Sequence, residues 1–459
     1  MSFIDLSTAF CISNQWYMKD SFVVRLISIV LSVIVTSFYF FTFNFRYFAG
    51  ANTKTVLAGI ALPLLLLQMA KGRKMGVSKD IVVFTTYSLC VSLTCLVATI
   101  YNNTTDYTYV TYVVSMWVWM AAAYVVVLSL ERLNGRVTFE TLSNYLIIVC
   151  VAQCVIAVLI SRFPVVKGVV GMIMPGIDGL EKMADGRLYG IGCAFDVAGI
   201  RFACVLVLII RMIIDQFKKK EVNKKLVYGY WIAFFVIVVI GNMIARTTTV
   251  GALIGLAYLI CTSIFSKGTE GVGALKSLFV ALAISIPLAA YLYQHDEMFR
   301  EDFRFGFEGF VSLVEKGTWE VSSNDILVTM YRFPETLKTW LIGDGYILTA
   351  NDDPYYLGEQ HPGYYYMGTD VGYLRFIYYA GLPLLLSFLL FLCYVTRICC
   401  QKYDKDVLMF LFILLVQIVV WFKVATDIFM FFALFVAYGK LEYAQDIEDS
   451  PQMIENNEE

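Results

Sequence analysis

The chain alternates long apolar runs with short polar connections over most of its 459 residues. About 20 consecutive apolar residues can cross the hydrocarbon core of a bilayer as a helix. We predict spans at residues 21–42, 55–70, 81–100, 109–130, 141–161, 193–214, 226–245, 248–265, 275–293, 371–395, 407–422 and 425–440. The pattern therefore predicts an all-α polytopic membrane protein with about twelve transmembrane helices.

One long polar segment, Gln294–Asp370, separates the ninth predicted span from the tenth. It is acidic, rich in aromatic residues, and contains both histidines of the chain. Connections of this length are usually functional or disordered, and the aromatic residues favour a folded external lid. We expect four parts: spans one to nine (1–293), the lid (294–370), spans ten to twelve (371–440) and a cytoplasmic tail (441–459).

The basic residues predict the orientation of the spans. They concentrate in alternate connections, which contain Lys71–Lys79, Arg132–Arg136, Lys218–Lys225, Lys267–Lys276 and Arg397–Lys405. The connections that carry an excess of Lys and Arg face the cytoplasm. Both termini are then cytoplasmic, and the lid faces outward together with the connection 162–192.

Composition excludes several classes of protein. The chain is 59% hydrophobic and 16% charged, with a mean hydropathy of +0.70, which is too apolar for a soluble protein of this length. It has no basic patch of the kind that binds nucleic acid. Zinc-site spacings and the P-loop, Rossmann and H-E-x-x-H motifs are also absent.

Ionisable residues in or beside the spans are candidates for function, because a charge in hydrocarbon is costly. Those that the predicted topology places at the outer boundary are Arg187, Asp196, Arg201, Arg246, Asp370, Arg375 and Asp427. Arginine presents a planar fork of donors that matches phosphate oxygens. The group therefore predicts a receptor for an anionic head group. The alternative is that these arginines pair with the carboxylates and hold helices together.

Several short motifs carry a resemblance to a known family. They are Arg187–Gly190, Ala245–Gly251, Leu341–Tyr346, Gly368–Tyr373 and Ala380–Leu382. In order and spacing, over roughly residues 140–440, they resemble motifs of the O-antigen polymerase (Wzy) and O-antigen ligase superfamily. The resemblance implies a GT-C-like fold in the bacterial inner membrane. It also implies a substrate linked to undecaprenyl pyrophosphate on the outer leaflet, and no cofactor or metal.

The resemblance also implies roles for individual residues. Arg187 and Arg246 match the family's arginines that hold the pyrophosphate, and we add Arg201 and Arg375 as further candidate ligands. A histidine tends to titrate near neutral pH, and His361 lies where the family often carries a histidine in its external loop.

The reaction needs a group that removes a proton from the acceptor hydroxyl. His361 and Asp370 are the candidates. For His361 the alternative is an exposed loop histidine, and for Asp370 it is a structural ion pair with Arg375.

The expected function is a polymerase that joins lipid-linked repeat units of O-antigen or capsular polysaccharide. Its expected partners are the bilayer, a chain-length regulator of the Wzz type and a flippase. The alternatives are a ligase, which would transfer finished glycan to lipid A core or protein, and a lipid-linked oligosaccharide flippase or transporter. The ligase pattern H-x-N-x-Y/F-L is not evident around His361, which weakens the ligase alternative.

Overall fold

The computed structural model describes residues 22–47, 51–70, 78–135, 137–175, 186–265, 270–348 and 365–448. These residues are almost entirely helical outside their turns, so the prediction of an all-α chain is confirmed for them. The long elements are α2 (Phe22–Phe40), α3 (Thr53–Ala70), α4 (Lys79–Asn102), α5 (Tyr112–Asn134), α6 (Phe139–Arg162), α9 (Phe195–Lys218), α10 (Lys224–Ile244), α11 (Thr248–Phe265), α12 (Glu270–His295), α17 (Gly372–Lys402), α18 (Val407–Val420) and α19 (Phe429–Glu448).

Each of the twelve predicted spans coincides with one of these helices. Within the described residues, nine of them are long and apolar enough to cross a membrane, and α3, α18 and α19 offer shorter apolar stretches. One further apolar helix, α7 (Pro164–Ile173), follows α6 in a connection where we predicted no helix. A multi-pass membrane protein is therefore the architecture that these helices support.

Polar residues mark the starts of several long helices. Ser78 before α4, Thr138 before α6 and Asn223 before α10 each accept a hydrogen bond from the backbone N–H three residues further on. Such N-caps satisfy one of the amide groups that has no partner within the helix. The polar connections therefore set where these apolar helices begin.

Helix α9 is the central element of the bundle. In the most apolar 18-residue stretch of α9, 94% of the positions are buried. The corresponding figure for α12, at the periphery, is 17%. It packs against α6, α10, α11, α12 and α18. Near the end opposite the lid, Arg211 of α9 pairs with Asp406 and, at 3.1 Å, with Asp215. This buried charge network, which we did not predict, ties α9 to the 3₁₀ turn η2 (Asp404–Asp406) before α18.

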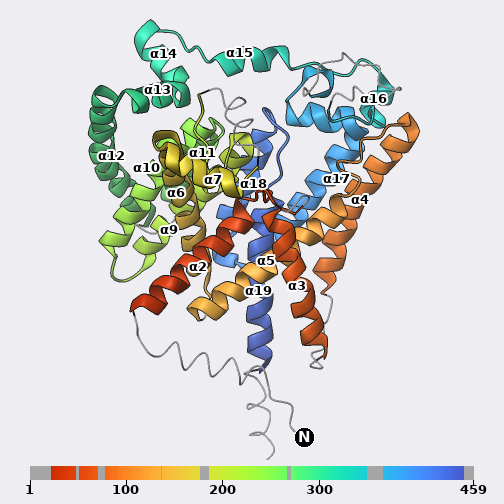
Figure 1. The fold of residues 1–459 in the computed structure, drawn as a ribbon, viewed down its shortest axis with the longest axis horizontal. Coiled ribbons are helices and arrows are strands. Elements are labelled where there is room, and N and C mark those ends of the chain that lie inside the picture. Colours follow the sequence, from red (N-terminus) through yellow and green to blue (C-terminus); the bar gives the residue numbers. More distant parts are fainter. Residues whose placement is uncertain are drawn as a thin grey trace, which may run out of the picture.

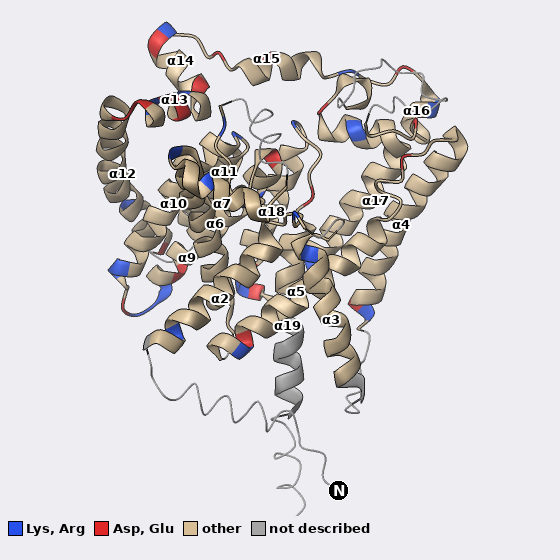
Figure 2. Cartoon of the chain, viewed as in Figure 1, with Lys and Arg blue, Asp and Glu red and all other residues tan. Residues whose placement is uncertain are grey.

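The described part of the lid lies across one end of the bundle (Figure 1). It contains α13 (Glu297–Gly306), α14 (Glu308–Lys316), α15 (Ser322–Thr329), α16 (Leu337–Leu341) and the 3₁₀ turn η1 (Tyr366–Gly368). Figure 1 shows α15 crossing from the α12 side of the molecule to the α17 side. Most charged residues gather at this end and at the opposite end, while the bundle between them is largely uncharged (Figure 2).

Two of the quoted motifs have a structural explanation. Helix α17 is kinked at Ala380 and Gly381, where Gly381 has φ +72°. The segment after α16 packs into this kink, and the N–H groups of Asp344 and Gly345 donate to the carbonyls of Tyr378 and Tyr379 at 2.6 and 3.0 Å. The Leu341–Tyr346 and Ala380–Leu382 motifs therefore dock the lid onto α17.

A close contact between α9 and α11 yields a test of the fold. A Cβ added at Gly251 would lie 2.1 Å from Ala203 Cα, whereas one at Gly255, a turn later, would have its nearest neighbour, Ile210 Cγ1, at 3.4 Å. Overpacking of this kind costs about 1–3 kcal/mol. We expect Gly251→Ala to lower the melting temperature of the purified protein and Gly255→Ala to leave it nearly unchanged. Equal melting curves would contradict the α9–α11 contact.

Candidate functional site

Two arginines from distant parts of the chain meet around one phenylalanine of the lid. Arg187 lies before α9, and Arg246 lies in the turn between α10 and α11. Their guanidinium carbons lie 5.3 and 4.3 Å from the ring centroid of Phe305 on α13. The N–H of Leu188 donates to the carbonyl of Met243 at 3.1 Å and joins the two segments. The two arginines predicted to hold pyrophosphate are therefore neighbours.

Each of the three guanidinium nitrogens of Arg246 contacts a residue of the lid. Its Nε donates to the Phe305 carbonyl at 3.0 Å, Nη1 donates to the Ser323 hydroxyl at 2.9 Å, and Nη2 lies 2.8 Å from Glu308 Oε2. Burial lowers the pKa of Arg246 from its usual value, Glu308 opposes that shift, and Arg187 adds to it. In this conformation Arg246 holds the lid against the α10–α11 turn.

Arg187 has fewer partners than Arg246. Its Nε is buried without a hydrogen-bond partner in the described part of the chain. The segment that carries it is fixed by Gln153 of α6, whose amide donates to the Ile191 carbonyl at 2.9 Å and accepts from the Ile191 N–H at 3.0 Å. A buried donor without an acceptor is destabilising, so within the described residues Arg187 is the member of the pair without an anionic partner.

Asp370 and Arg375 form a loose ion pair where α17 begins. Arg375 Nη1 lies 3.5 Å from Asp370 Oδ1, and the guanidinium carbon lies 3.7 Å from the centroid of the Tyr365 ring. Burial raises the pKa of Asp370 to about 6, although Arg375 lowers it; Asp196 raises it and Lys423 lowers it. A carboxyl with this pKa can accept a proton near neutral pH, which suits the predicted role of Asp370.

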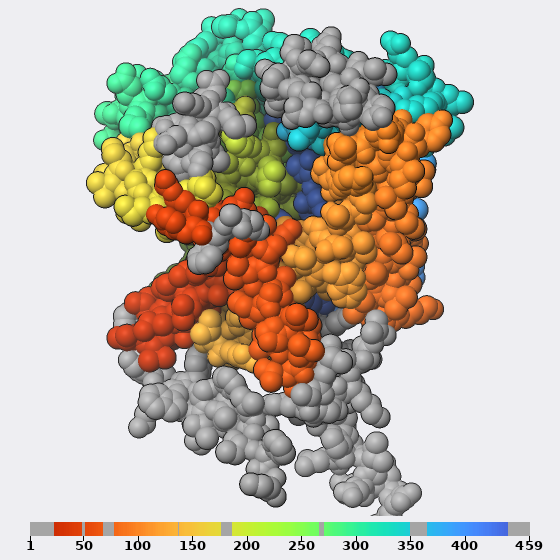
Figure 3. Space-filling view, turned by 45° about the vertical axis from the view of Figure 1, so that its right-hand side comes forward, coloured from red at the N-terminus to blue at the C-terminus, as the bar shows by residue number. Residues whose placement is uncertain are grey.

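Asp196 connects the two groups of residues. It lies in the first turn of α9, accepts a hydrogen bond from the Thr247 hydroxyl, and pairs with Lys423 at 3.2 Å. Thr247 directly follows Arg246 in the chain, which links Asp196 to the arginine pair. Asp196 and Lys423 both shift the pKa of Asp370, which links them to the Asp370–Arg375 ion pair. Figure 3 shows a hollow between the orange side formed by α4 and α5 and the yellow side formed by α6 and α7, with yellow-green segments at its back.

Arg201 does not join the arginine pair. It is only 6% exposed on α9, and its guanidinium carbon lies 5.6 Å from the centroid of the Phe41 ring. Within the described residues it makes no hydrogen bond or ion pair, and its electrostatic neighbours are Cys193, Cys150 and Tyr39. The structure therefore places Arg201 within α9, separate from Arg187 and Arg246.

The second predicted proton acceptor, His361, lies outside the described residues. The other histidine, His295, ends α12 and stacks on Tyr291 with the ring centroids 4.2 Å apart. Among the described residues, no group of three or more His, Cys, Asp or Glu side chains is placed to hold a metal ion. Asp370 is thus the predicted proton acceptor whose surroundings the structure describes.

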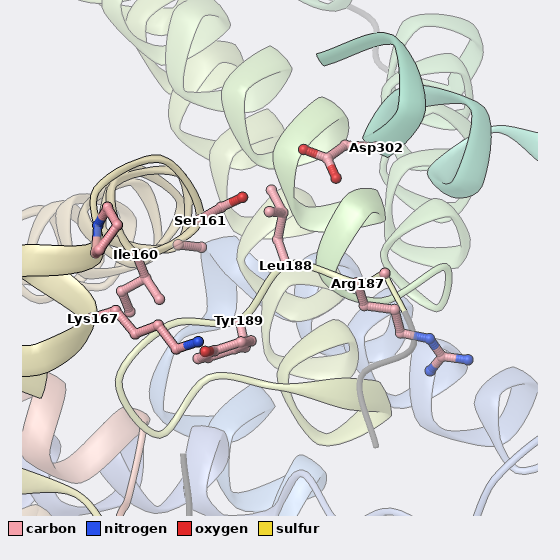
Figure 4. Close-up of a pocket in the computed structure, with 10 residues that line it drawn as sticks. Ile160, Ser161, Lys167, Arg187, Leu188, Tyr189 and Asp302 are labelled. Carbon is pink, nitrogen blue, oxygen red and sulfur yellow. The ribbon is translucent and has the colours of Figure 1, made fainter. Parts of the chain in front are cut away.

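A cavity of about 400 Å³ lies behind the segment that carries Arg187 (Figure 4). Its lining includes Ser161 of α6, Lys167 of α7, Tyr189 and the carboxylate of Asp302 on α13. Asp302 was not among the predicted site residues, because nothing in the sequence distinguishes it from the other acidic residues of the lid. Its position three residues before Phe305 on α13 places both on one helix face.

Comparisons with protein-family models, with curated proteins and with solved structures gave no match. The resemblance to the O-antigen polymerase and ligase superfamily therefore rests on the residues quoted above.

The lid contact of Arg246 can be tested with a matched pair of variants. Glu308→Gln removes the partly buried partner of Arg246, whereas Glu315→Gln removes the partner of Arg304 in a pair whose side chains are both 45% exposed. Exposed pairs contribute little to stability. We expect limited proteolysis of purified protein to cut residues 297–329 several-fold faster in Glu308→Gln than in wild type, and at the wild-type rate in Glu315→Gln. Equal rates in all three proteins would show that Arg246 does not hold the lid.

Proposed function

We propose that the protein is a GT-C-type glycosyltransferase that joins undecaprenyl-pyrophosphate-linked repeat units into O-antigen or capsular polysaccharide. The observation that carries this proposal is the convergence of Arg187 and Arg246 on Phe305 beneath a folded lid. Only Arg246 of the two has a carboxylate partner among the described residues, Glu308. The pair therefore carries an excess of positive charge, which suits a pyrophosphate.

The proposed setting is the outer face of a bacterial inner membrane. Twelve spans with both termini in the cytoplasm would place the lid and the arginine pair on that face. Six helices, namely α3, α5, α9, α11, α17 and α19, would then begin at the outer side. Their N-termini carry partial positive charge, which adds to the attraction for a lipid-linked pyrophosphate. A chain-length regulator and a flippase remain the proposed protein partners.

In the proposed reaction a hydroxyl oxygen of the acceptor glycan attacks the anomeric carbon of the donor glycan. A new glycosidic C–O bond forms, and the C–O bond to undecaprenyl pyrophosphate breaks. Negative charge grows on the leaving pyrophosphate, so fixed guanidinium groups stabilise the transition state more than the ground state. The hydroxyl proton passes to Asp370 or His361, and a carboxyl whose pKa is about 6 is largely ionised at neutral pH and able to take it.

Deletion of the gene in its native strain tests the function. We expect gels of surface glycan to show single repeat units on their final carrier and no polymer, because repeat units would no longer be joined. Full-length polymer stranded on undecaprenyl pyrophosphate would instead indicate a ligase. Repeat units held at the cytoplasmic face would indicate a flippase, and an unchanged glycan profile would exclude all three roles.

Substitution of the arginine pair tests the pyrophosphate site. We expect Arg187→Ala and Arg246→Ala to abolish long-chain glycan while the protein still inserts into the membrane, because the leaving group would lose its cationic partners. Arg304→Ala, at an exposed ion pair of the lid, is the control and should retain polymer.

A second comparison separates the two contributions of Arg246. Glu308→Gln releases the same lid contact but keeps the guanidinium, so polymer should persist in that variant. Equal loss of polymer in Arg246→Ala and Glu308→Gln would mean that Arg246 acts only by holding the lid. Normal polymer length in both alanine variants would refute the pyrophosphate site.

A further inference from the structure

The cavity behind the segment that carries Arg187 is lined by four segments of the described chain. Helix α6 contributes Ser161, α7 contributes Lys167, the segment 186–189 contributes Tyr189, and α13 contributes Asp302. Figure 4 shows the Asp302 carboxylate and the Ser161 hydroxyl directed into the space between these elements. The cavity thus has polar groups on opposite sides, and the lid helix α13 forms part of its wall.

Asp302 has no evident structural task. Within the described residues it makes no hydrogen bond and no ion pair. Burial raises its pKa to about 6, although the nearby Arg162 lowers it. Placing a carboxylate in such a site without partners is costly, and carboxyls with perturbed pKa values in cavities are candidates for function.

The position of Asp302 is fixed at both ends of its helix. At the start of α13, Asp296 caps the helix and pairs with Arg162 of α6 at 2.5 Å. At the end, a Cβ on Gly306 would lie 3.1 Å from the Asn242 carbonyl carbon, so α13 rests directly on α10. A carboxylate held between two anchored helix ends is preorganised to receive a ligand.

The lining of the cavity combines the carboxylate of Asp302 with the cationic residues Lys167 and Arg187. The guanidinium of Arg187 points away from Lys167, Tyr189 and Asp302 in Figure 4, so Arg187 lines the cavity without turning its charge toward Asp302. The Asp302 carboxylate would repel a phosphate. A ligand rich in hydroxyl groups suits it better, because hydroxyls donate to carboxylates in charge-assisted hydrogen bonds.

The size and the apolar part of the lining agree with a sugar. The volume of about 400 Å³ lies within the range of roughly 300–1,000 Å³ of small-molecule sites and can admit a sugar ring. Apolar side chains of Ile160 and Leu188 also line the space and can cover the apolar face of a sugar.

We propose that this cavity binds one sugar ring of the glycan substrate, with the carboxylate of Asp302 accepting hydrogen bonds from its hydroxyl groups. The inference rests on the proposed function, because it names where a part of the substrate sits beside the pyrophosphate site. It adds the carbohydrate-binding residue that the arginine pair does not supply.

Carboxyl labelling of the purified full-length protein tests this proposal. An apolar carbodiimide near pH 6 should modify Asp302, and mass spectrometry would quantify the product. The probes are methyl glycosides of glucose, galactose, mannose and N-acetylglucosamine, oligosaccharide released from the cells' own surface glycan, and inorganic pyrophosphate. Glu301, the exposed neighbour of Asp302, is the internal control.

We expect at least one sugar probe to protect Asp302 several-fold, with no protection by pyrophosphate and no change at Glu301. Asp302→Asn should weaken binding of the protecting sugar by about tenfold or more, because a hydrogen bond to a charged group contributes about 1.5–3 kcal/mol. Glu301→Gln should bind as wild type does.

Two results would overturn the proposal: protection by pyrophosphate alone, or protection by no probe. Failure of the proposed function would look different. An unchanged surface glycan after gene deletion, with Asp302 still protected by a sugar, would refute the polymerase and leave the sugar site standing.

Discussion

The close approach of α9 and α11 is the constraint on which the rest of the structure depends. Gly251 faces Ala203 at a distance that admits no side chain, and Gly199, a turn earlier on α9, faces Ala245 and Thr247 in the same way. Because α9 is enclosed by other helices, these contacts fix the α10–α11 turn at one end of the bundle. Arg246 belongs to that turn, so its position follows from helix packing more than from its charge.

The same packing explains why charged residues are tolerated at this end of an apolar bundle. Asp196 in the first turn of α9 is satisfied by Thr247 and Lys423, and helix N-termini favour an acidic residue. Deeper in α9, Arg211 is compensated by Asp406 and Asp215. Arg201, between them, has the face of the Phe41 ring and no ion-pair partner among the described residues. Within the described residues, Arg201 is therefore the charge of α9 that lacks an internal counter-charge.

The sequence predicted the helices well and the site only in part. Apolar runs are long enough to predict every long helix of the described residues, and the family resemblance implied that Arg187 and Arg246 share one ligand. The partners of Arg246 could not be foreseen, because Glu308 and Ser323 come from a lid whose path no periodicity specifies. Arg201 was placed with the others by its depth in a span. Depth alone does not say which side of a helix a residue occupies.

The lid and the proposed ligand compete for one guanidinium. All three nitrogens of Arg246 are engaged by Phe305, Ser323 and Glu308, so a phosphate can reach them only by displacing lid groups. On the proposed function, substrate binding and release of the lid are then one linked equilibrium. A ligand shifts such an equilibrium only by its difference in affinity for the two states. Arg187, whose Nε has no partner in the described chain, offers the first contact without that cost. The order in which a pyrophosphate engages the pair, Arg187 before Arg246, follows from this asymmetry.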